Sequence, residues 1–166
     1  MQPLPHTSPM FTISRAALED APTILAMQRR AFAEEGRLCG SMDILPLAEP
    51  LAAIAEHIAH HTAFVARIGQ DIVGAIRGVA ADGVCTIRGL CIEPAHHGCG
   101  MGSALLAALE AAHPEVARFA LTTNTVMPLN VRFYERHGYH VRELTRVPVN
   151  IVLAQMEKVA RTNSGN

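Results

Sequence analysis

Apolar side chains recur at every third or fourth position in two parts of the N-terminal half of the chain, which is the spacing of a helix packed on a core. The first pattern predicts a helix from about Glu19 to Glu35, with Gly36 as its stop. Residues 37–46 are turn-like and show no clear period. The second helix is expected after Pro50, with four apolar residues on one face: Leu51, Ile54, Ala55 and Ile58.

The next part of the chain changes to β-branched stretches separated by turn residues. Gly69-Gln70 and Asp82-Gly83 are typical of tight hairpins. They separate three predicted strands, at residues 62–68, 71–80 and 84–93. We therefore expect an antiparallel meander whose third strand ends at Pro94, because proline cannot donate a hydrogen bond to a neighbouring strand.

The remaining elements alternate between strands and helices. They are a short strand at 11–14, a helix at 103–112, a strand at 118–122, a helix that begins at Pro128 and stops at Gly138, and strands at 139–146 and 150–158. The order β-α-α-β-β-β-α-β-α-β-β predicts an α+β fold with a central mixed, mostly antiparallel sheet flanked by helices on both faces.

The composition fits one domain, expected at residues 11–160 between a flexible leader (1–10) and a flexible tail (161–166). The 14 Lys and Arg residues nearly balance 15 Asp and Glu, so the positive field that a nucleic-acid binder needs is missing. No apolar run has the length of a membrane span, and the N-terminus does not resemble a signal peptide. We therefore expect a cytoplasmic protein whose four cysteines are reduced: Cys39, Cys85, Cys91 and Cys99.

Three glycines at alternate positions (Gly98, Gly100 and Gly102) lie between the third strand of the meander and the next helix. Without Cβ atoms, successive backbone N–H groups there converge on one point. The helix adds its unpaired N–H groups and the positive end of its dipole, so the turn suits a phosphate or pyrophosphate. The dinucleotide fingerprint does not fit, because Ser103 holds its third glycine position, and no Gly-Lys-Ser/Thr follows as in a phosphate-binding loop.

Two segments resemble the GNAT family of N-acetyltransferases. His97-Gly98-Cys99-Gly100-Met101-Gly102 is similar to the family's acetyl-CoA signature, Q/R-x-x-G-x-G/A. Asn130-Val131-Arg132-Phe133-Tyr134-Glu135-Arg136-His137-Gly138-Tyr139 resembles its later helix with the Tyr-Glu-x-x-Gly-Phe/Tyr ending. The two blocks stand in the family's order, and the predicted elements follow the family's order from about Phe11 to Lys158.

This resemblance implies an acetyl-CoA-dependent enzyme that acetylates a primary amine by direct attack in a ternary complex. Backbone groups of Leu90, Cys91 and Ile92 would bind the pantetheine arm, and the segment from Gly98 to Ser103 would hold the pyrophosphate. That segment includes Cys99, Gly100, Met101 and Gly102. Tyr134 matches the tyrosine that protonates the departing thiolate, although a tyrosine that only anchors its helix is the alternative.

The sequence departs from the family pattern at two positions. His97 stands where Gln or Arg is usual, so we expect weaker or pH-dependent CoA binding. Met127 replaces an Asn that contacts the cofactor in many members. Asn130, one turn later, is then the candidate cofactor contact, with helix capping as its alternative role.

The sequence does not choose a general base. The candidates are Glu34, Glu35, Glu93, His57, His60, His61 and a chain of water molecules. Glu34 and Glu35 are equally well explained as a solvated helix end. We expect no metal, because His57 and His61 have helical ligand spacing but nothing indicates a third ligand. Cys91 and Cys99 are expected to pack rather than to act as nucleophiles.

The acceptor is expected to be a small-molecule or peptide amine, with no nucleic-acid or membrane partner. Its pocket should be largely neutral or apolar, which argues against a polycationic acceptor. The residues expected to line it are Leu38, Met42, Ile44, Leu45, Val147 and Val149. The apolar final strands are compatible with a homodimer. Two other functions stay open: a non-catalytic CoA-binding or regulatory module on the same fold, and a metal- or redox-dependent small enzyme.

Overall fold

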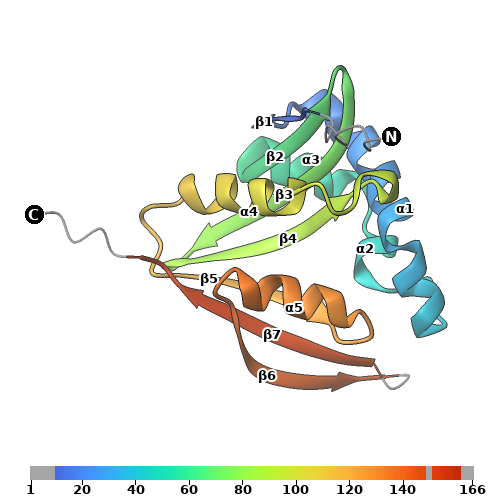
Figure 1. Cartoon of the computed structure of the whole chain (residues 1–166), viewed down its shortest axis with the longest axis vertical. Coiled ribbons are helices and arrows are strands. Elements are labelled where there is room, and N and C mark those ends of the chain that lie inside the picture. Colours follow the sequence, from blue (N-terminus) through green and yellow to red (C-terminus); the bar gives the residue numbers. More distant parts are fainter. Residues whose placement is uncertain (1–9, 149–150, 162–166) are drawn as a thin grey trace, which may run out of the picture.

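The predicted hairpins form the centre of one seven-stranded sheet with the order β1-β2-β3-β4-β5-β7-β6 (Figure 1). The strands are β1 (Thr12–Arg15), β2 (Thr62–Ile68), β3 (Asp71–Ala81), β4 (Val84–Ile92), β5 (Arg118–Asn124), β6 (His140–Val147) and β7 (Ile151–Val159). All neighbouring strands are antiparallel except β4 and β5. The mixed, mostly antiparallel α+β sheet is thereby confirmed.

The computed structural model describes residues 10–148 and 151–161. The expected leader, except Met10, and the expected tail, except Arg161, lie outside these ranges. Val149 and the first residue of the last predicted strand, Asn150, also lie outside them.

Helices cover both faces of the sheet, as predicted. They are α1 (Ala21–Cys39), α2 (Leu45–Ala48), α3 (Leu51–His60), α4 (Met101–Ala111) and α5 (Pro128–Arg136). Ile24 and Met27 of α1 and Ile54 of α3 are fully buried in a cluster on one face of the sheet. On the other face, Leu105 and Leu109 of α4 are fully buried against the sheet, and α5 packs on the edge of the same cluster. Within the described ranges, no helix is long and apolar enough to cross a membrane.

The parallel pair β4–β5 is short, and this divides the sheet. The two strands pair only from Val84 opposite Arg118 to Thr86 opposite Ala120. Beyond that point β5 stays paired with β7, while β4 stays paired with β3. The two strands therefore diverge toward their C-terminal ends, where the glycine turn and α5 lie (Figure 1).

A bulge in β4 lies where the strands diverge. Ala75 pairs with Cys91 and Arg77 with Arg88, so β4 contains one more residue than β3 over this interval. Gly89 is in this interval with φ +61°, a left-handed conformation that glycine adopts without steric cost. The bulge changes which face of the sheet the following side chains occupy, so that Cys91 packs on the α1 side and Leu90 on the α4 side.

Two predicted helix boundaries are wrong. The first helix continues through Gly36 to Cys39, and Gly40 ends it in the left-handed conformation. Gly36 instead permits close packing, because a Cβ there would overlap the side chain of Leu47 in α2, a helix that the sequence did not predict. Helix α4 begins at Met101 rather than at residue 103, so part of the glycine turn is already its first turn.

Candidate active site

A cavity of about 1340 Å³ occupies the space between the diverging strands. It exceeds the roughly 300–1,000 Å³ of a typical single-ligand pocket, which leaves room for two substrates. The residues proposed from the sequence as site residues line it, with the exception of Cys99: Leu90, Cys91, Ile92, His97, Gly98, Gly100, Met101, Gly102, Ser103, Asn130 and Tyr134.

The glycine turn has the open shape that an anionic ligand requires. Gly98 and Gly100 have φ of +80° and +81°, and a Cβ on either would meet no atom within 4 Å. Gly100 is the N-cap of α4, so the unpaired N–H groups of the helix begin at this point. The chain therefore fits the diphosphate of a CoA thioester here. Met101 can contribute only its backbone, because its side chain is buried in the core.

His97 and Cys99 have local partners within the turn. A ring nitrogen of His97, Nε2, lies 3.2 Å from the carbonyl oxygen of Ile92. Because that oxygen can only accept, the nitrogen donates. The Cys99 thiol donates to the carbonyl of His96 at 2.9 Å, and Cys99 is not among the residues that line the cavity.

Ser103 has a partner that the sequence did not indicate. Nδ1 of His137 donates to the Phe133 carbonyl at 2.7 Å, so in the neutral ring Nε2 accepts from the Ser103 hydroxyl at 2.9 Å. This bond ties the first turn of α4 to the end of α5. The Phe133 ring adds to the contact, because a Cβ on Gly102 would lie 3.4 Å from it.

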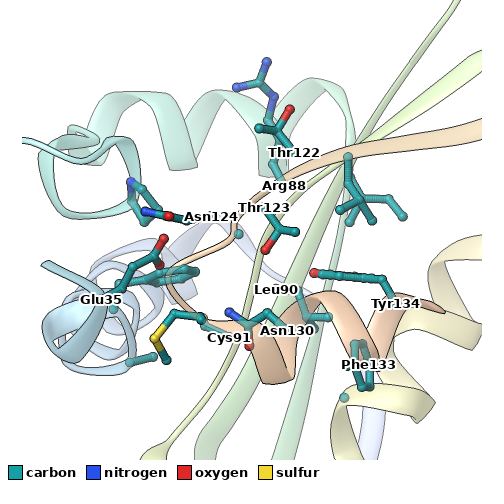
Figure 2. Close-up of a pocket in the computed structure, with 18 of the residues that line it drawn as sticks. Glu35, Arg88, Leu90, Cys91, Thr122, Thr123, Asn124, Asn130, Phe133 and Tyr134 are labelled. Carbon is teal, nitrogen blue, oxygen red and sulfur yellow. The ribbon is translucent and has the colours of Figure 1, made fainter. Parts of the chain in front are cut away.

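Tyr134 points from α5 into the cavity (Figure 2). Burial, with further contributions from Cys91 and Glu35, raises the pKa of its phenol above the ordinary value, so the hydroxyl keeps its proton at neutral pH. Among the residues that the structure describes, this hydroxyl has no hydrogen-bond partner. The neighbouring Tyr139 differs, because it is fully buried and donates to Glu110 at 2.8 Å.

Of the side chains considered as a base, only Glu35 lines this cavity. It comes from α1, faces the space opposite Tyr134 beside Asn124 (Figure 2), and is 7% exposed, so it is not the solvated helix end that was the alternative explanation. Burial raises the pKa of its carboxyl, and a hydrogen bond with Asn124 offsets part of the rise. A carboxyl with a raised pKa near a substrate pocket is suited to accepting a proton close to neutral pH.

The other candidates for the base have different surroundings. Glu34 forms an exposed pair with Arg37, and Glu93 forms a two-bond pair with Arg30. His60 is the last residue of α3 and His61 follows it, and both are exposed. His57 lies with Nδ1 2.8 Å from Nη1 of Arg77, so this nitrogen accepts from the guanidinium.

No group of three or more candidate metal-binding side chains occurs in the described ranges. Cys91 is expected to pack rather than to react, and the structure agrees: burial raises the pKa of its thiol to about 12, which makes it an unsuitable nucleophile.

A buried ionic cluster supports the wall of the cavity next to Glu35. Arg77 of β3 is 2% exposed, and both of its terminal nitrogens donate to Glu49 at 2.8 Å. Gln28 of α1 accepts from Arg77 at 2.9 Å and donates to Glu49 at 2.8 Å. Nothing in the sequence marked these residues as partners, because they come from three separate segments of the chain: α1, the end of α2 and β3.

The expected neutral lining of the acceptor side is only partly correct. Ile44, Leu45 and Val147 line the cavity, whereas Leu38 and Met42 are exposed and do not. Charged side chains also line it, among them Glu35 and Arg88. Arg88 was missed because an exposed arginine in a strand has no distinctive sequence signal.

A family comparison agrees with the fold. The model of the acetyltransferase (GNAT) domain matches residues 59–141, half of the chain, including β4, the glycine turn and α5. The fold and the site define an acyltransferase-type domain with a split sheet. The chain belongs to the GNAT family.

Solved structures share this fold at low sequence identity. The ribosomal-protein-S18-alanine N-acetyltransferase of Escherichia coli has a TM-score of 0.77 at 17% identity, over 95% of this chain and 98% of that chain. The Salmonella typhimurium protein yncA, solved with its cofactor acetyl-CoA, has a TM-score of 0.70 at 16% identity, over 93% and 96%. The PaiA N-acetyltransferase of Thermoplasma acidophilum, in complex with coenzyme A, has a TM-score of 0.69 at 17% identity, over 90% and 99%. No curated protein matches the sequence.

Proposed function

We propose that this protein is an acetyltransferase that moves the acetyl group of acetyl-CoA to a primary amine by direct attack in a ternary complex. The observation that carries the proposal is the placement of Tyr134 and Glu35 on opposite sides of one cavity that begins at the glycine turn (Figure 2). Acetyl-CoA supplies the activated thioester. The chain supplies a proton donor on the α5 side and a proton acceptor on the α1 side.

The cofactor end of the cavity is assigned to the glycine turn and the end of β4. Backbone N–H groups from Gly98 to Ser103 would hold the pyrophosphate, together with the positive end of the α4 dipole. Leu90, Cys91 and Ile92 lie beyond the last residue of β4 that pairs with β5, and their backbone groups would bind the pantetheine arm. Asn130 lines the same cavity from α5 and is a candidate for a further polar contact.

The proton transfers in the proposed reaction balance through two side chains. As the amine nitrogen bonds to the acetyl carbon and the carbon–sulfur bond breaks, the Tyr134 hydroxyl gives its proton to the sulfur. Glu35 takes the proton that the amine loses. The Tyr134 hydroxyl has no partner within residues 10–148 and 151–161, which supports this role, since a tyrosine that only anchored its helix would have its hydroxyl bonded, as Tyr139 has.

The first experiment is calorimetric titration of the purified protein with acetyl-CoA, desulfo-CoA and NAD. Micromolar binding of the two CoA compounds, with none of NAD, is the expected result. An amine screen with acetyl-CoA then follows, with Tyr134→Phe as the control for chemistry. Absence of CoA binding would contradict the proposal. Tight binding without turnover of any amine would instead identify a CoA-binding module.

A further inference from the structure

Arg88 lies in β4 on the face of the sheet that α4 and α5 do not cover. Its neighbours Cys85 and Ile87 pack in the α4 cluster, so by strand alternation Thr86 and Arg88 point to the other face. Thr86 is the last residue of β4 that pairs with β5. Arg88 is two residues further on, where the strands part, and its side chain lines the cavity.

The same face of β5 carries Thr122, two residues beyond Ala120. In Figure 2 Arg88 and Thr122 lie together on one border of the cavity, while Asn130 and Phe133 lie on the opposite border. Because Phe133 contacts the glycine turn, that second border belongs to the cofactor side. Arg88 is therefore on the acceptor side, the side from which α1 presents Glu35.

The charge of Arg88 has no carboxylate partner in the described part of the chain. Six other arginines there do form ion pairs: Arg30, Arg37, Arg67, Arg77, Arg118 and Arg142. The buried carboxylate of Glu49 is already paired, because both of its oxygens accept from Arg77. The carboxyl groups of Glu35 and Asp43 also line the cavity, and neither forms an ion pair with Arg88 among the described residues.

We infer that Arg88 binds a carboxylate of the acceptor, so that the substrate is a small amine that also carries a carboxylate group. This inference rests on the proposed function, because it uses the same cavity and the same base. Arginine presents paired donors that match the two oxygens of a carboxylate. The amine of such a substrate would face Glu35 and the thioester while its carboxylate is held at β4.

The phosphates of the cofactor do not explain Arg88. Arg132 and Arg136 of α5 line the cavity on the side of the glycine turn and are exposed there. The cofactor's phosphates thus have cations on their own side of the sheet. A cation on the opposite face, at the point where β4 and β5 part, is left for the second substrate.

The test is a set of matched substrate pairs, each an amino carboxylate and its carboxamide. Glycine, β-alanine, 4-aminobutyrate and 6-aminohexanoate vary the spacing between the two groups, and leucine and methionine add apolar side chains. We expect kcat/KM with acetyl-CoA to be about tenfold or more higher for the best acid than for its amide. Arg88→Gln should remove that preference. It should lower kcat/KM for the acid and leave kcat/KM for the amide within about twofold of the wild-type value. Arg29→Gln, an exposed arginine outside the cavity, is the matched control.

Calorimetry separates this inference from the proposed function. The CoA-loaded protein is titrated with the same pairs, for wild type and Arg88→Gln. Arg88-dependent binding of the acids without turnover would support the anion site and overturn the acetyltransferase. Turnover of amides equal to that of acids would keep the acetyltransferase and overturn the anion site. An acid preference that survives Arg88→Gln would also overturn the role of Arg88.

Discussion

The guanidinium group of Arg77 lies directly against the backbone of Gly89, and a Cβ at residue 89 would overlap its Nη2 atom. Glu49, Gln28 and His57 hold the same guanidinium from three other segments of the chain. The bulge in β4 is thus built around a buried charge, and the wall of the cavity depends on a contact that only glycine allows.

The first prediction concerns that contact. Gly89→Ala should destabilise the protein by clearly more than Gly69→Ala, as measured by urea unfolding. Gly69 has nearly the same φ, +59° against +61°, but a Cβ there would meet no atom within 4 Å. Both variants bear the conformational cost of about 1–2 kcal/mol for a left-handed residue, so the difference between them isolates the overlap with Arg77. Equal destabilisation would show that the close approach is absent.

The second prediction concerns the charge of Glu49. Burial by itself would raise the pKa of this carboxyl, but hydrogen bonds from Arg77 and Gln28 outweigh it, and the pKa is lowered from the usual 4.5. A lowered pKa means that the ion pair stabilises the fold above about pH 4.5 and that this contribution is lost as the pH falls through the folded-state value. Glu49→Gln should therefore cost about 3 kcal/mol at pH 7.

The pH dependence distinguishes this pair from surface charges. The stability difference between wild type and Glu49→Gln should narrow below pH 4.5, when denaturant unfolding is repeated at pH 7, 5, 4 and 3. Glu34→Gln is the control, because Glu34 also has a lowered pKa beside Arg37 but is exposed to solvent. A difference for Glu49→Gln that stays constant over this range would contradict a charged Glu49.

The sequence predicted the order of elements because local signals determined it. Asp82 and Gly83 both adopt positive φ, at 52° and 76°, as the Asp-Gly turn requires, and this fixes the register of β3 against β4. Gly36 was misread as a helix stop because its role is a contact with Leu47, eleven residues away in the chain, and no local pattern reports such a contact.

In the candidate site, too, residues in local motifs were predictable and residues defined by distant contacts were not. The glycine turn and Tyr134 were predictable, because they lie in contiguous motifs. Glu35 remained one of several candidates for the base, because the sequence does not show which of these side chains is buried in the cavity. Arg77 and Arg88 were not predicted at all. The surroundings of Arg77 depend on the bulge at Gly89, whereas Arg88 lines the cavity because β4 and β5 part beyond Thr86.

The third prediction compares the two tyrosines of the chain. Tyr134→Phe should lower kcat by about 10²–10⁴-fold, because it removes the proposed proton donor, while acetyl-CoA affinity and the melting temperature stay close to those of the wild type. Tyr139→Phe should do the reverse. It removes a buried hydrogen bond to Glu110, which costs about 1 kcal/mol of stability, and it should change kcat little. If both variants lost activity equally, Tyr134 would be acting only through packing.

The last prediction is the pH profile of the reaction. Because burial raises the pKa of Glu35, its carboxyl stays protonated to a higher pH than an ordinary glutamate, and only the ionised form can accept a proton from the amine. The acidic limb of kcat/KM for acetyl-CoA, measured at saturating amine, should therefore lie above the usual pKa of 4.5. Glu35→Gln should lower the plateau and remove this limb, whereas Glu34→Gln should preserve both. A limb that survives in Glu35→Gln would assign the base to another group or to water, since the ionisation of Glu35 would then have no effect on the rate.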